Sequence, residues 1–156
     1  MVYLDLIFNL ALLVALSVVS GFLDKRFARE TRPGQLLQGL LFGVVTVLGM
    51  LRPLVLGPGL IFDGRSVMLC LCAVYFGPLA AAVAGGAALV CRILLGGMGL
   101  LTGSLVIASS LALGLAAHYR WKPSLAPPGA GRLILLGLAV HAAMLALMLT
   151  LPGGAG

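Results

Sequence analysis

Long apolar runs separated by short polar links form the main pattern along this chain. Residues 2–23 form the first run, which at a rise of ~1.5 Å per residue can cross a hydrocarbon layer of ~30 Å as a helix. Further apolar runs follow at residues 35–51, 79–95, 102–119 and 133–151. Because each run suits a membrane-spanning helix, we predict an all-α fold, a polytopic bundle of transmembrane helices.

A shorter apolar run, residues 66–76, ends at the break Gly77-Pro78. As a helix it would extend ~16 Å, about half of a bilayer. Proline cannot continue a helix, and the residue before it leaves the helical region. The run is either a half-span that closes a re-entrant hairpin or a short crossing that ends in a tight turn. We favour the crossing, with Pro78 opening the next helix. This predicts about six membrane helices, one of them short or broken (66–76), in a single transmembrane domain over residues 1–156.

The composition excludes an ordinary soluble domain. The chain is 62% hydrophobic and 9% charged, with a mean hydropathy of +1.19, whereas soluble domains carry about 25% charged residues. The net charge of +6 does not indicate a nucleic-acid partner, because the basic residues are spread along the connecting segments. We therefore expect this chain to lie in membrane lipid.

Candidate catalytic and metal-binding residues are scarce. Cys70, Cys72 and Cys91 lie in apolar runs without the spacing of metal ligands. The sequence has only four acidic residues and shows no Ser-His-Asp, Cys-His or paired-carboxylate arrangement. We expect no metal, no cofactor and no enzymatic activity in this chain.

The basic residues predict an orientation, because cytoplasmic segments of membrane proteins carry an excess of Lys and Arg. The segments predicted to be cytoplasmic contain Lys25, Arg26, Arg29, Arg32, Arg120, Lys122 and Arg132, and the outer segments contain Arg52, Arg65 and Arg92. The N-terminus is then extracytoplasmic. An even number of crossings places the C-terminus outside as well. A cytoplasmic output domain would need one more span, so we expect this chain to be a fragment of a longer protein.

Two arginines indicate a binding site at the outer end of the bundle. Arg65 begins the short helix and Arg92 ends the helix that faces it. A charge within a membrane segment costs ~2.5–3.5 kcal/mol on insertion scales, so it usually marks a function. The helix that starts near Thr102 would point its N-terminus, which favours anions, the same way. We predict a site for a small anion formed by Asp63, Arg65, Arg92, Gly97, Thr102, Gly103 and Ser104.

Structural alternatives remain open for most of these residues. Asp63 caps the short helix or pairs with Arg65 in one alternative, and Arg92 extends to the lipid headgroups in another. Thr102 is a candidate N-cap. A Gly39/Gly43 GxxxG pair permits close helix approach, and it is a weak indication of dimerisation.

The chain also resembles the LytS–YhcK-type five-transmembrane receptor domain. The resemblance is carried by Asp63-Gly64-Arg65, Phe76-Gly77-Pro78-Leu79, Arg92, Gly96-Gly97, Gly103 and the opening Leu6-Ile7-Phe8-Asn9-Leu10. It implies a sensory input domain of two-component histidine kinases or diguanylate cyclases, with signal transduction to a cytoplasmic output and a homodimer as the expected state. It also implies a small carboxylate ligand held by Arg65 and Arg92. A solute-binding component of a transporter is the alternative.

Overall fold

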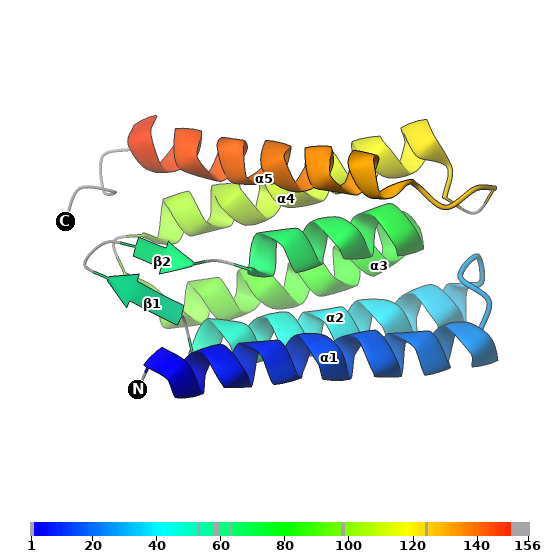
Figure 1. The fold of residues 1–156 in the computed structure, drawn as a ribbon, viewed down its shortest axis with the longest axis horizontal. Coiled ribbons are helices and arrows are strands. Elements are labelled where there is room, and N and C mark those ends of the chain that lie inside the picture. The colour runs from blue at the N-terminus through cyan, green and yellow to red at the C-terminus, as the bar shows by residue number, and fades with distance from the viewer. Residues whose placement is uncertain are drawn as a thin grey trace.

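A computed structural model describes residues 2–52, 54–57, 60–62, 64–97, 99–123 and 125–150. The described elements, in chain order, are α1 (Val2–Arg26), α2 (Arg32–Leu51), β1 (Leu54–Gly57), β2 (Leu60–Phe62), α3 (Arg65–Leu95), α4 (Leu100–Trp121) and α5 (Ala130–Thr150) (Figure 1). Within these residues, 5 helices are long and apolar enough to cross a membrane. The predicted all-α transmembrane bundle is therefore confirmed, and the chain is a multi-pass membrane protein.

Helix α3 consists of two antiparallel arms, which accounts for the predicted count of about six. Gly77 has φ 84° and ψ −167°, outside the helical region, and Pro78 follows it at the start of the second arm. Figure 1 shows the first arm running from β2 towards one end of the bundle and the second arm returning. The arms share one core, in which Cys72 and Phe76 of the first arm belong to the same cluster as Ala80 of the second. The break at Gly77-Pro78 was thus predicted correctly.

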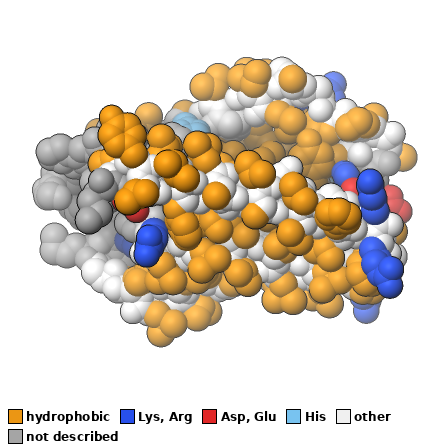
Figure 2. All heavy atoms as spheres, turned by 60° about the horizontal axis from the view of Figure 1, so that its bottom comes forward, with side chains coloured by type: hydrophobic (Ala, Val, Ile, Leu, Met, Phe, Trp, Pro, Cys, Tyr) orange, Lys and Arg blue, Asp and Glu red, His pale blue; other side chains and the backbone are white. Residues whose placement is uncertain are grey.

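The two ends of the bundle differ in charge. At one end, here called the basic end, α1 and α4 finish and α2 and α5 begin (Figure 1). All of the Lys and Arg residues assigned to cytoplasmic segments lie there. The opposite end, here called the hairpin end, carries the start of α1, the β1–β2 pair and the turn between α3 and α4. Figure 2 shows hydrophobic side chains along the length of one face and Lys and Arg gathered at its two ends.

The links between helices differ in two places from the prediction. The segment 54–62, which lies between two predicted helices, contains β1 and β2, which pair antiparallel. Helix α2 begins at Arg32 instead of residue 35, because Thr31 caps it by accepting a hydrogen bond from the Gly34 N–H at 3.3 Å.

Small residues let α2 and α3 approach closely. A Cβ on Gly39 would lie 2.9 Å from the Ala80 carbonyl oxygen, and a Cβ on Gly43 would lie 3.2 Å from the Ala87 Cβ. The GxxxG pair of α2 is therefore buried against the second arm of α3 within one chain. The motif is thus used for packing within the chain, and dimerisation through it stays a prediction.

A polar contact joins α1 to the rest of the bundle. Leu16 is buried on α1, but most of its apolar side chains face outward. Gln38 of α2 is only 2% exposed and reaches Ser20 of α1 twice. The Ser20 hydroxyl donates to Gln38 Oε1 at 2.9 Å, and Gln38 Nε2 donates to the Ser20 carbonyl at 2.9 Å. Interhelical hydrogen bonds of this kind hold helices together in lipid, where apolar attraction between helices is weak.

Replacing Gln38 with methionine should weaken the attachment of α1. Methionine keeps the side-chain volume but loses both hydrogen bonds. We therefore expect the free energy of unfolding to fall by about 1 kcal/mol. Titration of the purified protein from mild detergent into SDS measures this change. Ser17→Ala on the exposed face of α1 is the control, and equal stability of Gln38→Met and Ser17→Ala would contradict the contact.

Candidate functional site

Arg92 lies against the first turn of α4. A Cβ on Gly103 would be 2.4 Å from Arg92 Nε and 3.0 Å from Cζ, and a Cβ on Gly99 would be 2.8 Å from a terminal guanidinium nitrogen. The side chain therefore occupies the space that these two glycines leave open. Its Nε is buried and has no hydrogen-bond partner among the described residues. This position differs from the alternative in which Arg92 extends along lipid to the headgroups.

The turn between α3 and α4 brings backbone amides to the same place. Gly96 and Gly97 have φ of 61° and 91°, a region that side chains rarely adopt. The Gly96 N–H donates to the Arg92 carbonyl at 3.1 Å, which ends α3 and turns the chain back on itself. Helix α4 then begins at Leu100. The Leu100 N–H donates to the Gly97 carbonyl, and the Gly103 N–H donates to the Gly99 carbonyl. The N-terminus of a helix carries partial positive charge, which favours an anion nearby.

Arg65, the first residue of α3, lies beside α2. Its Cγ would be 3.8 Å from a Cβ on Gly49 of α2, and Asn9 Oδ1 of α1 would be 4.0 Å from the same point. Thr46, one turn deeper on α2, is fully buried, and its hydroxyl has no partner among the described residues. Asn9 Nδ2 donates to the Asp5 carbonyl of its own helix at 2.8 Å.

The two arginines have similar depths but different neighbours. Counting from the turn at Gly77, the rise of a helix places Arg65 about 18 Å away and Arg92 about 22 Å away. The difference is less than one helical turn. However, Arg65 packs towards α2, and Arg92 packs towards α4.

The remaining predicted site residues divide into two groups. Thr102, Gly103 and Ser104 lie in the first turns of α4, and Gly97 lies in the turn before it. The N-cap of α4 is Gly99, so the alternative that Thr102 is the cap is wrong. Asp63 lies outside the described residues.

Two glycines near the arginines were not predicted as site residues. A Cβ on Gly99 would collide with Arg92, and a Cβ on Gly49 would lie within van der Waals distance of Arg65. The sequence contains one signal for the first: Gly99 and Gly103 are four residues apart, which puts both on one face of α4. No comparable signal links Gly49 to Arg65, because the contact depends on how α2 and α3 pack.

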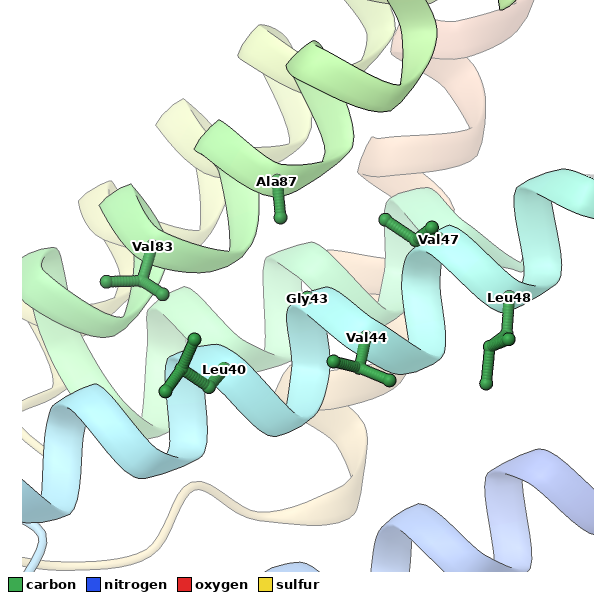
Figure 3. Close-up of a pocket in the computed structure, with 7 residues that line it drawn as sticks. All are labelled: Leu40, Gly43, Val44, Val47, Leu48, Val83 and Ala87. Carbon is green, nitrogen blue, oxygen red and sulfur yellow. The ribbon is translucent and has the colours of Figure 1, made fainter.

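A groove elsewhere on the surface is unsuited to an anion. It has a volume of about 230 Å³ and lies between α2 and the second arm of α3 (Figure 3). Its lining is Leu40, Gly43, Val44, Val47, Leu48, Val83 and Ala87. Without a polar side chain this groove cannot solvate a charge.

The described residues show no group of three or more His, Cys, Asp or Glu that could hold a metal ion. Cys70, Cys72 and Cys91 are buried and free. The groups described at the start of α4 are the Arg92 guanidinium, the hydroxyl groups of Thr102 and Ser104 and backbone amides, which suit recognition of an anion.

Comparison with known proteins gives one match. The profile of a family described as "5TMR of 5TMR-LYT" matches residues 10–155, almost the whole chain. Searches of curated proteins and of solved structures gave no match.

Proposed function

Because the chain belongs to the 5TMR-LYT family of five-transmembrane receptor domains, we propose that it is a sensor that binds a small anion at its hairpin end. The family supports a membrane sensory input domain that is not itself catalytic. The proposed ligand is carboxylate-like and enters from the extracytoplasmic side. The observation that carries this proposal is the place of Arg92 on the first turn of α4.

Electrostatics supports an anion at this position. A helix N-terminus carries about half a positive charge, so a guanidinium beside it is unfavourable unless a negative group neutralises both. Of the described acidic residues, Asp24 is paired with Arg29 at the basic end, and Glu30 lies in the same link. Asp5 is on α1, which packs on α2 and not on α4. An anion that binds beside Arg92 at the first turn of α4 would supply the missing charge with forked hydrogen bonds.

Arg65 adds a second positive group to the proposed site. Both arms of α3 end near the same depth, so an anion at the hairpin end is attracted by both arginines. Thr102 and Ser104 supply hydroxyl groups on α4 that suit carboxylate or phosphate oxygens. We propose Gly97 and Gly103 as positions where the backbone or the arginine approaches the ligand, and Asp63 as a residue that orients Arg65.

The receptor would act by changing helix packing. Ligand binding shifts an equilibrium only if it favours one arrangement over another. We propose that this shift passes to a cytoplasmic histidine kinase or diguanylate cyclase, as part of a homodimer in a bacterial inner membrane. The basic end then faces the cytoplasm, in agreement with the distribution of Lys and Arg.

Binding of simple anions tests the proposal. Purified protein in lipid nanodiscs should bind pyruvate, acetate or inorganic phosphate with a Kd between micromolar and millimolar. It should not bind acetamide, the uncharged analogue of acetate. Gly103→Ala should raise the Kd of the tightest-binding anion about tenfold. The added Cβ would displace the Arg92 guanidinium, which is proposed to make charge-assisted hydrogen bonds to the anion. Isothermal titration calorimetry measures both, and equal affinity for acetate and acetamide would reject an anion site.

Transport is the second candidate, because the broken helix α3 resembles the discontinuous helices of transporters. Proteoliposomes that contain the chain should not accumulate labelled pyruvate if it is a receptor. Saturable uptake that Arg92→Leu abolishes would favour the transporter.

A further inference from the structure

The inner turn of α3 has lost one of its own hydrogen bonds. In a continuous helix the N–H of residue 78 would donate to the Val74 carbonyl, but Pro78 has no N–H. His118 near the end of α4 takes this place, with its Nδ1 2.7 Å from the Val74 carbonyl oxygen. The imidazole also lies over the turn itself, since a Cβ on Gly77 would be 3.2 Å from His118 Nε2. One side chain thus joins the end of α4 to the turn of α3.

A second side chain holds the same turn from the other side. Arg29, in the link between α1 and α2, has its guanidinium carbon 5.8 Å from the ring centroids of both Tyr75 and Phe76. Arg29 also binds Asp24 of α1 with two nitrogens, and Nε is 2.6 Å from Oδ1. The hydrogen bond with Asp24 raises the pKa of Arg29 above its ordinary value, so the guanidinium stays charged over the aromatic rings.

The same helix reaches both ends of the molecule. Its first arm begins at Arg65 and its second arm carries Arg92, both at the hairpin end. Its turn, where Gly77 has a positive φ that residues with a side chain rarely adopt, is at the basic end. A displacement of either arm at the hairpin end must therefore move the turn or bend the arm.

We propose that His118 and Arg29 form a latch on the turn of α3, and that this latch transmits rearrangements of the hairpin end to the ends of α1 and α4. Each latch contact is individually weak and lies at the edge of the bundle, which suits a contact that opens and closes. The inference goes beyond the receptor function, and it rests on that function only for the direction in which the signal travels.

The test is a mutant cycle that needs no ligand. Hydrogen–deuterium exchange of residues 70–80 and 115–122 is measured by mass spectrometry on the protein in nanodiscs. Arg92→Leu releases the contact with α4 and should raise exchange in both segments at least about fivefold. Arg52→Leu removes another arginine of the hairpin end, one whose guanidinium lies over the Phe8 ring of α1, and should leave both segments unchanged.

Variants of the latch residues complete the mutant cycle. His118→Leu combined with Arg29→Gln should raise exchange in the same segments, and adding Arg92→Leu should then have no further effect, because the connection is already open. Arg26→Gln, an exposed neighbouring charge, is the control for Arg29. Additive effects of Arg92→Leu and the latch variants would overturn the proposal.

A conservative variant separates a latch from a general loss of folding. Asparagine at position 118 can place an amide N–H near the position of Nδ1. His118→Asn should therefore retain the effect of Arg92→Leu on hydrogen exchange, whereas His118→Leu should abolish it. Trp121, the one tryptophan of the sequence, packs on the cluster that contains Val74, and its emission reports the same movement without labels. If no tested anion binds wild type but the cycle is non-additive, the receptor function fails and the latch stands. Anion binding that leaves Trp121 emission unchanged would reject the latch alone.

Discussion

Replacing Arg92 with leucine should weaken anion binding about 100-fold. The guanidinium is the one charged group that the structure places on the first turn of α4 among the described residues. A hydrogen bond to a charged group contributes about 1.5–3 kcal/mol, and each ~1.4 kcal/mol is a factor of ten in Kd. Leucine keeps much of the apolar volume, so the loss should appear in the affinity and less in the stability. Calorimetric titration with the tightest-binding simple anion measures it.

Two further variants are compared with Arg92→Leu in the same titration. Arg52→Leu removes the same charge from the hairpin end at a position that faces Phe8, and it should retain nearly wild-type affinity. Asp63→Asn removes the carboxylate proposed to orient Arg65, so it should weaken binding, but less than Arg92→Leu does. An unchanged Kd for Arg92→Leu would remove the proposed site, and the receptor function would then depend on family membership alone.

Replacing Gly114 with alanine should cause a large loss of stability. Its Cβ would lie 2.5 Å from the Cys70 carbonyl oxygen and 2.7 Å from the Ala73 Cβ. Because one of these atoms is backbone, α4 must move away from the first arm of α3. Overpacking of this kind costs about 1–3 kcal/mol, which exceeds the gain of up to ~1 kcal/mol from replacing a helical glycine by alanine. SDS titration of the purified protein, followed by circular dichroism, measures the shift.

Gly137 provides the matched control on α5. Its Cβ position has no neighbouring atom within 4 Å, so Gly137→Ala should be neutral or slightly stabilising. Equal stability of Gly114→Ala and Gly137→Ala would show that α3 and α4 are not packed as closely as described here.

Most of the helices could be predicted from the sequence because their physical cause is local. A membrane-spanning helix needs a long apolar run, and the runs found in the sequence correspond to α1, α2, α4, α5 and the second arm of α3. The break in α3 was predictable for the same reason, since Pro78 prevents a continuous helix whatever surrounds it. The short pair β1–β2 was missed because hairpin pairing in an apolar segment leaves no distinct periodicity.

Side-chain partners were harder to predict. Gly39 and Gly43 were identified as a packing surface, but the sequence could not tell whether α3 of the same chain or a second copy would cover it. The role of His118 was also missed, because its partner is the Val74 carbonyl, 44 positions away in the sequence. Such contacts depend on the relative rotation and height of two helices.

The sequence by itself determined that this chain crosses a membrane several times, that α3 breaks at Gly77, and that its positive charges divide unequally between the two ends. These properties follow from hydrocarbon thickness, proline geometry and charge, which act on each segment separately. Only the tertiary structure decided that Arg92 lies on α4, that Arg65 lies beside α2, and that the turn of α3 is held by His118 and Arg29. The direction of a side chain depends on the neighbour against which its helix packs, and that neighbour is selected by the fit of whole surfaces.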